Sequence, residues 1–206
     1  MKFDDNMKLN AVQLRELEEE KARGTLREVK RNPLYFILEN IYDTYNIGGL
    51  FRLADALAIE KMYLVGDTEI PPNSRIKKAS IGTYKVVDWQ YCKTTREAIE
   101  SIKHLTSNVK PQTSNIKRYE DMFKVRSLKL KVIAVEQYPK AIDYKKADYS
   151  FPLALVFGNE SYGVLPETLK LVDQIVEIPM WGINKSLNVI VSAAIVSYHS
   201  TKFLIE

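Results

Sequence analysis

The segment Phe157-Gly-Asn-Glu-Ser-Tyr-Gly163 places one carboxylate between two glycines. The run 151–157 that leads into it has no polar interruption, as expected for a strand buried on both faces. Such a strand delivers Glu160 to a turn, where a buried carboxylate requires a cation or several N–H donors. The segment is therefore a candidate site, although an ordinary strand-to-helix turn could have the same residues.

A second candidate is Asn46-Ile-Gly-Gly-Leu-Phe-Arg52, where an amide and a guanidinium flank two glycines. We predict a helix over 48–57 with Asn46 as its cap, and the glycines would allow a close approach to the backbone. Arg52 lies about one turn inside this helix and could hold a phosphate through two parallel N–H bonds. The simpler interpretation is a glycine-loosened helix start with a surface arginine.

The third candidate, Ser186-Leu-Asn-Val189, opens a long apolar helix predicted over 187–204. Ser186 is a suitable N-cap, and Asn188 would lie in the first turn. Taken alone, this segment is interpreted as a capped helix and nothing more.

Other chemistries have little support in the sequence. It contains none of the G-x-G-x-x-G, P-loop, H-E-x-x-H or G-x-S-x-G motifs. His104 and His199 are the only histidines, and we favour a structural or surface role for each. Cys92 is the only cysteine, which excludes an internal disulfide and a multi-cysteine metal site and favours a place in the core. We expect no metal.

The 206 residues carry a formal net charge of +4, which permits a nucleic-acid partner without requiring one. No stretch approaches the roughly 18 uninterrupted apolar residues of a membrane span, and the N-terminus has no signal-peptide pattern. We therefore expect a cytoplasmic protein with no membrane contact. Three basic clusters, each more simply interpreted as solvated surface, are Arg75, Lys77 and Lys78; Lys117 and Arg118; and Lys124, Arg126, Lys129 and Lys131.

Short apolar strands alternate with helices along most of the chain, which predicts an α/β domain with a mainly parallel sheet. Ligands of such sheets bind beyond the carboxyl ends of the strands. Residues 1–32, with a helix over about 10–30, form a predicted N-terminal helical extension, and 33–206 form the domain. The predicted strands are 34–38, 62–65, 86–89, 131–135, 151–157 and 174–178, and the other predicted helices are 96–105 and 166–172.

In this order and on these elements, the three segments resemble the three signature motifs of the SpoU/TrmH branch of the SPOUT RNA methyltransferases. The resemblance extends from about Pro33 to the C-terminus, and Ile178–Met180 also fits it. It is specific because motif order, spacing and flanking elements all agree. The matching residues are Asn46, Gly48 and Arg52 in the first motif, Gly158, Glu160 and Gly163 in the second, and Ser186, Leu187 and Asn188 in the third.

The resemblance implies an α/β fold with a mainly parallel sheet, helices on both faces and a C-terminal deep trefoil knot, a rare exception to the usual topology. It implies S-adenosyl-L-methionine as cofactor, and a homodimer in which the first motif of one subunit completes the site of the other. The small residues Ser192, Ala193, Ala194 and Ser197 of the last helix could form the dimer contact. The implied cofactor-binding residues are Val135, Gly158, Ile178, Ser186 and Leu187.

The implied reaction is methyl transfer to a ribose 2′-hydroxyl of tRNA or rRNA. A guanidinium is a poor base because it stays protonated, so we favour Arg52 as a phosphate clamp that stabilises the developing oxyanion. Two alternatives stay open: a catalytically inactive RNA-binding protein of the same fold, and an unrelated α/β binding module. The implied catalytic residues are Arg52, Asn46, Glu160, Ser186 and Asn188.

One residue departs from the family pattern. Ile190 stands two residues after Asn188, where the family often has a small polar residue. We expect a change of packing there more than a loss of activity. The sequence shows no sizeable separate RNA-binding domain, so the choice of target is left to residues 1–32, the basic clusters and the dimer surface.

Overall fold

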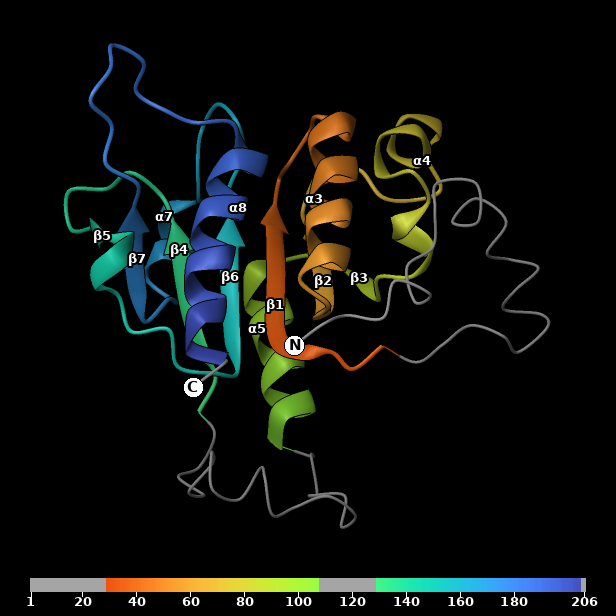
Figure 1. The fold of residues 1–206 in the computed structure, drawn as a ribbon, viewed down its shortest axis with the longest axis horizontal. Coiled ribbons are helices and arrows are strands. Elements are labelled where there is room, and N and C mark those ends of the chain that lie inside the picture. Colours follow the sequence, from red (N-terminus) through yellow and green to blue (C-terminus); the bar gives the residue numbers. More distant parts are fainter. Residues whose placement is uncertain (1–28, 108–128, 205–206) are drawn as a thin grey trace.

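Seven strands form one sheet, in the order β3-β2-β1-β6-β4-β7-β5, in the computed structural model, which describes residues 29–107 and 129–204 (Figure 1). All neighbouring strands are parallel, as the alternation of strands and helices predicts. The strands are β1 (Asn32–Glu39), β2 (Ile59–Val65), β3 (Trp89–Cys92), β4 (Lys131–Val135), β5 (Ile142–Asp143), β6 (Leu153–Phe157) and β7 (Gln174–Glu177).

Helices cover both faces of this sheet, which confirms the predicted layers. In Figure 1, α3 and α8 lie in front of the sheet with α4 beside α3, and α5 lies behind it. The residues that follow α7 pack on the rear face together with α5. The helices are α3 (Thr44–Ala56), α4 (Ser74–Ser80), α5 (Thr95–Ser107), α7 (Pro166–Leu169) and α8 (Val189–Ser200), with 3₁₀ turns at Thr83–Lys85, Tyr144–Lys146 and Thr201–Leu204.

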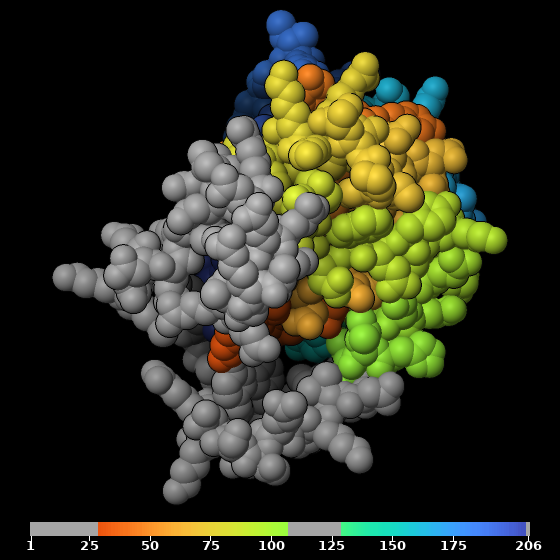
Figure 2. Space-filling view, turned by 90° about the vertical axis from the view of Figure 1, so that its right-hand side faces the viewer, coloured from red at the N-terminus to blue at the C-terminus, as the bar shows by residue number. Residues whose placement is uncertain are grey.

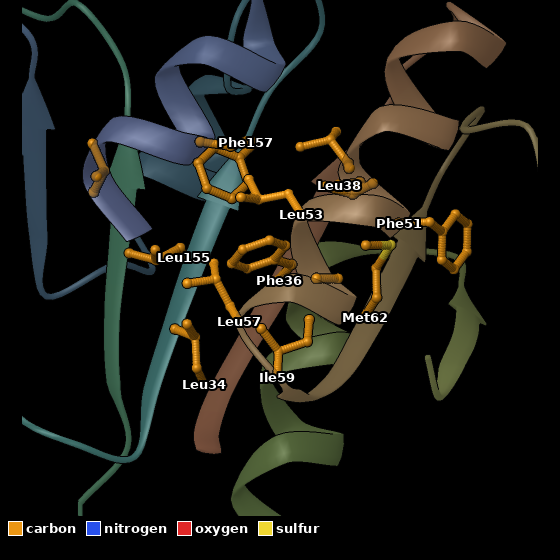
Figure 3. Packing of buried hydrophobic residues seen from close by; sticks show 14 of the residues in the cluster. Leu34, Phe36, Leu38, Phe51, Leu53, Leu57, Ile59, Met62, Leu155 and Phe157 are labelled. Atoms are coloured by element: carbon orange, nitrogen blue, oxygen red, sulfur yellow. The ribbon is translucent and has the colours of Figure 1, made fainter. Parts of the chain in front are cut away.

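The interior strand β1 contributes to two hydrophobic clusters. Phe36 belongs to the front cluster under α3 and α8, whereas Tyr35 and Ile37 belong to the rear cluster with α5. On the front side, the ring of Phe36 meets that of Phe157 edge-on, with centroids 5.3 Å apart (Figure 3). Each fully buried side chain of this size contributes about 1.5–3 kcal/mol. Burial on both faces explains why these strands have uninterrupted apolar sequences.

The carboxyl ends of the parallel strands lie along one edge of the sheet, at the top of Figure 1. Both α3 and α8 begin near this edge and descend along the front face. The first turns of these two helices and the turn after β6 therefore gather beyond the strand ends, where ligands bind in sheets of this kind.

A buried carboxylate connects the sheet to its rear helices at the same edge. Glu39, the last residue of β1, is 2% exposed and accepts hydrogen bonds from the hydroxyls of Thr95 and Thr168. It also accepts from Leu165 N at 2.8 Å. Because Thr95 begins α5 and Leu165 is the N-cap of α7, one side chain sets where both helices start.

Most predicted elements are confirmed to within a few residues, but the third strand is misplaced. Residues 83–85 form a 3₁₀ turn and Val87 packs into the front core, so the pairing with β2 falls to Trp89–Cys92 instead of 86–89. The helix predicted over 166–172 ends at Leu169. The sequence pattern missed α4 and β5 because seven and two residues are too few to show a period.

The predictions for the N-terminal extension and for two basic clusters fall mostly outside the described residues. The helix over 10–30 lies almost wholly there, as do Lys117, Arg118, Lys124 and Arg126. Lys129 and Lys131 are described, and each lies near a carboxylate: Asp173 at 3.9 Å and Asp148 at 3.3 Å.

Candidate active site

Glu160 is the centre of a hydrogen-bond network at the carboxyl edge. Its carboxylate accepts from Tyr42 N and Asp43 N, both at 3.3 Å, and from Asn46 Nδ2 at 2.9 Å. The expectation that this carboxylate needs several N–H donors is therefore confirmed. The expectation that it is buried is wrong, because the turn projects beyond the strand ends and leaves Glu160 exposed.

Asn46 joins the other two motifs and does not cap its helix. The N-cap of α3 is Asp43, whose side chain accepts from Tyr45 N at 2.8 Å, so the helix begins earlier than predicted. Asn46 therefore lies inside α3 and is only 6% exposed. Its amide nitrogen donates to Glu160, and its Oδ1 accepts from Asn188 Nδ2 at 3.0 Å.

The start of α8 also differs from the prediction. Asn188, not Ser186, is the N-cap, with its Oδ1 accepting from Ile190 N at 2.8 Å. One amide thus caps α8 through its oxygen and holds Asn46 through its nitrogen. Ser186 is exposed in the preceding loop, where its N–H lies 3.4 Å from Asn184 Oδ1.

The turn after β6 is closed by its own backbone and by two side chains that the sequence interpretation missed. Asn159 and Gly163 exchange two backbone hydrogen bonds, and Gly163 has a φ of +70°, which glycine adopts without strain. Asn159 Nδ2 donates to Asn40 O at 2.7 Å, and Glu136 accepts from Val164 N at 2.7 Å. The place of Glu136, the first polar residue after an apolar strand, is the signal that could have identified it.

A cavity of about 490 Å³ lies beside this turn. Among its lining residues are Glu136, Glu160 and Glu177, and the described residues that line it include no lysine or arginine. The cavity is thus acidic. Asn188, which also lines it, is hydrogen-bonded to Asn46 in the network around Glu160. All five residues predicted to bind cofactor line it: Val135, Gly158, Ile178, Ser186 and Leu187.

Arg52 is not part of this cavity in the single chain. It is exposed on α3 and forms no hydrogen bond or ion pair with the other residues of the described ranges. Six residues of α-helix separate it from Asn46, which corresponds to about 9 Å along the axis and about 120° around it. Within the first motif, the amide of Asn46 therefore joins the network of its own chain, whereas the guanidinium of Arg52 is exposed on a different side of α3.

The two glycines of the first motif each accommodate a different neighbour. A side chain at Gly48 would overlap Ala79 of α4, and one at Gly49 would overlap Ile190 of α8. The large Ile190 is thus packed over a glycine, a packing adjustment of the kind expected at this position. One dimer expectation needs correction, because Ala193 and Ser197 are fully buried within the chain and cannot contact a partner.

The single cysteine and the two histidines lie outside the cavity and the hydrogen-bond network of Glu160. Cys92 is 6% exposed in the rear core, as predicted, and burial raises the pKa of its thiol. His199 packs against Tyr144, Tyr149 and Phe203, while His104 is exposed. Within 29–107 and 129–204, no cluster of His, Cys, Asp or Glu suits a metal ion, and no helix has the length and apolar character of a membrane span.

The family model described as "SpoU rRNA Methylase family" matches residues 33–122 and 106–198. The chain belongs to the SpoU rRNA methylase family.

Curated SpoU relatives resemble the chain over most of its length. A tRNA (guanosine(18)-2′-O)-methyltransferase of Thermus thermophilus is 29% identical over 186 residues, which cover 89% of this chain and 83% of the relative. The Escherichia coli protein of the same name is 25% identical over 174 residues, covering 84% of this chain. The match spans only 65% of that relative's length.

Solved structures of RNA-modifying enzymes share the fold. An Aquifex aeolicus TrmH/SpoU tRNA modifying enzyme superimposes with a TM-score of 0.65 at 21% identity, covering 91% of this chain and 83% of that one. An AdoMet-bound rRNA methyltransferase from Sinorhizobium meliloti gives a TM-score of 0.67 at 22% identity, covering 86% and 59%. The mainly parallel α/β architecture is therefore that of the SpoU family.

Proposed function

We propose that this chain transfers a methyl group from S-adenosylmethionine to a ribose 2′-hydroxyl of tRNA or rRNA. One observation carries the proposal: hydrogen bonds among Asn46, Glu160 and Asn188 join the three family motifs at the acidic cavity. Curated relatives named as tRNA and rRNA 2′-O-methyltransferases support the same reaction.

The cavity fits S-adenosylmethionine in size and charge. Its volume of about 490 Å³ lies within the usual range of small-molecule pockets, and its carboxylates suit a positively charged ligand. When bound, the cofactor supplies an electrophilic methyl group on a sulfonium sulfur. The residues that would hold it are Val135, Gly158, Ile178, Ser186 and Leu187, all of which line the cavity.

Arg52 would reach the reacting ribose from a second subunit. It is exposed on α3 beside α8, and α8 presents the half-exposed side chains of Val191 and Tyr198. A homodimer formed through these faces would bury apolar surface and carry each Arg52 toward the partner's cavity. There the guanidinium clamps the neighbouring RNA phosphate and stabilises the developing oxyanion, while Asn46, Glu160, Ser186 and Asn188 hold the loops and ribose in place.

The finer points of architecture belong to this proposal as well. A deep trefoil knot in the C-terminal part is supported by family membership and by α8, which contacts β4 and β6 after the chain has formed β7. The division into an extension at 1–32 and a methyltransferase domain at 33–206 stays a prediction. So does a cytoplasmic location.

An in vitro transfer assay tests the reaction. Purified protein, total tRNA or rRNA and methyl-labelled S-adenosylmethionine should give ribose-methylated nucleotides. In a second experiment, mass spectrometry compares the ribose-methylated positions in RNA from cells with and without the gene. Arg52→Ala should abolish transfer while leaving cofactor affinity within about twofold, because Arg52 is outside the cavity of its own chain. Arg96→Ala, an exposed arginine on the rear helix α5, is the matched control.

Absence of cofactor binding in a calorimetric titration would contradict the proposal and favour an inactive RNA-binding protein. Near-normal turnover of Arg52→Ala would remove the role given to this arginine.

Subunit mixing tests whether the site is shared. In a mixed dimer of Arg52→Ala and Asn188→Ala subunits, one of the two sites would contain both wild-type residues. Activity should therefore reappear when two inactive preparations are mixed. If each site used its own Arg52, no site would be intact and the mixture would stay inactive.

A further inference from the structure

A second cavity, of about 290 Å³, is connected to the first by the hydrogen bonds of Glu160. The Glu160 carboxylate lines the first cavity and accepts from the N–H groups of Tyr42 and Asp43, which line the second. The opposite wall of the second cavity includes Glu69 and Asn73, from the connection between β2 and α4, and Arg75 from α4 itself. A ligand in the second cavity would therefore be separated from the proposed methyl donor by the Glu160 carboxylate.

The two walls are held in place by buried contacts. Thr68, 4% exposed, accepts from Ile41 N at 2.9 Å, and its hydroxyl lies within donor distance of both Val65 O and Leu38 O. These contacts tie the β2–α4 connection to the end of β1. Gly48 lets α4 pack directly on α3, because a side chain there would overlap Ala79. The cavity is therefore formed without a ligand, as binding sites usually are.

Two tyrosines give this cavity aromatic character. Tyr42 and Tyr45 are 52% and 54% exposed, although large aromatic side chains normally gain free energy by burial. Unstacked bases of single-stranded RNA bind to proteins largely by stacking on such rings. A nucleobase would cover the rings and leave its ribose near Glu160.

Charged groups in the same cavity have unused hydrogen-bonding capacity. The side chains of Glu69 and Arg75 form no hydrogen bond or ion pair with other residues of the described chain. A carboxylate accepts from base N–H groups, and a guanidinium donates to O6 and N7 of guanine. Guanine alone among the four bases offers adjacent N–H donors on one edge and two acceptors on another. Lys77 and Lys78, exposed on the α4 surface seen in yellow at the upper part of Figure 2, add charge for the phosphates.

We propose that this second cavity binds an unstacked guanine base of the RNA substrate, with Tyr42 and Tyr45 as the stacking surface and with Glu69 and Arg75 reading its edges. The inference rests on the proposed function, since it identifies the nucleotide that the same site receives. It also gives α4, which the sequence pattern missed, a role in substrate choice.

Oligonucleotide binding tests this assignment in the full chain. The probes are four fluorescent RNA pentamers of uridine with guanosine, adenosine, cytidine or uridine in the centre, measured by anisotropy at low salt. The guanosine pentamer should bind about tenfold tighter than the uridine pentamer. Tyr42→Ala should weaken the guanosine pentamer about tenfold, and Glu69→Gln and Arg75→Ala should each reduce the preference for guanosine.

Tyr91→Ala and Arg96→Ala are the matched controls, because Tyr91 is 44% exposed on β3 and Arg96 is exposed on α5. Both should bind all four pentamers as the wild type does. Equal affinity for the four pentamers, or a guanosine preference that survives all three cavity substitutions, would overturn the inference.

Cofactor titration and the transfer assay separate this inference from the proposed function. A wild-type protein that prefers the guanosine pentamer but transfers no methyl group would support the base site and contradict the reaction. A protein that methylates RNA while its base preference is unaffected by Tyr42→Ala, Glu69→Gln and Arg75→Ala would support the reaction and overturn the base site.

Discussion

Two glutamates at the carboxyl edge of the sheet differ in their surroundings. Glu39 is 2% exposed and accepts from two threonine hydroxyls and the N–H of Leu165, all on the rear side. Glu160 is exposed on the front side and accepts from three N–H donors at 2.9–3.3 Å. Hydrogen bonds in a dry interior are stronger, and more costly to lose, than those open to water. We therefore expect the stability of the fold to depend on Glu39 and the rate of the proposed methyl transfer to depend on Glu160.

The largest expected effect on stability is at Glu39. Glu39→Ala should lower the free energy of unfolding by about 3 kcal/mol, because it leaves two buried hydroxyls and one N–H without an acceptor. Glu39→Gln keeps one acceptor oxygen and should cost roughly half as much. Urea denaturation measures both variants. If Glu39→Ala lowered the free energy of unfolding by less than about 1 kcal/mol, the proposed difference in stability role between Glu39 and Glu160 would be wrong.

Glu160→Gln sharpens the contrast from the other side. It should lower the methyl-transfer rate about 100-fold, because an amide cannot accept all three N–H bonds and the motifs shift relative to one another. The free energy of unfolding should change by less than about 1 kcal/mol, since the group is exposed. The transfer assay and urea denaturation are run on the same preparation. A variant that transfers normally but unfolds more readily would reverse the proposed division of roles.

Asn188 combines both roles in one amide, so its variants can separate them. Asn188→Ala should cost about 1 kcal/mol of stability through loss of the α8 cap and should also impair transfer. Asn188→Asp keeps a capping oxygen but brings a carboxylate to Asn46 Oδ1, so it should impair transfer while the stability loss is smaller. Equal stability losses in the two variants would show that the cap contributes little.

The smallest expected effect lies at the other end of α8. Burial, with Lys202 and Lys145 nearby, lowers the pKa of His199, and Asp143 only partly opposes this. The unfolded chain therefore binds a proton more readily, so stability should fall as the pH drops through the unfolded value of 6.5. Thermal unfolding of the wild type and His199→Gln between pH 8 and 5 would show it, as a steeper decline in the wild type. Parallel profiles would contradict the assignment.

The strands could be predicted because burial on both faces produces uninterrupted apolar runs. Donors around Glu160 were predicted from the cost of burying a carboxylate, but the folded chain supplies them to an exposed group. The helix caps could not be predicted. Asp43 and Asn46, like Ser186 and Asn188, are pairs of good capping residues a few positions apart. The partner that each side chain finds in the folded chain decides between them. The direction of Arg52 was also hidden, because it depends on where α3 begins.

The position of β6 has a consequence for how the protein is made. β1, β2 and β3 are close in sequence, and their pairing can form while the rest of the chain is still on the ribosome. The other edge of β1 pairs only with Leu153–Phe157, which is synthesised much later. Until then an apolar strand presents open hydrogen-bonding groups, the kind of edge that associates with other nascent chains. Substitutions that delay β6 should therefore lower the yield of soluble protein before they alter the folded molecule.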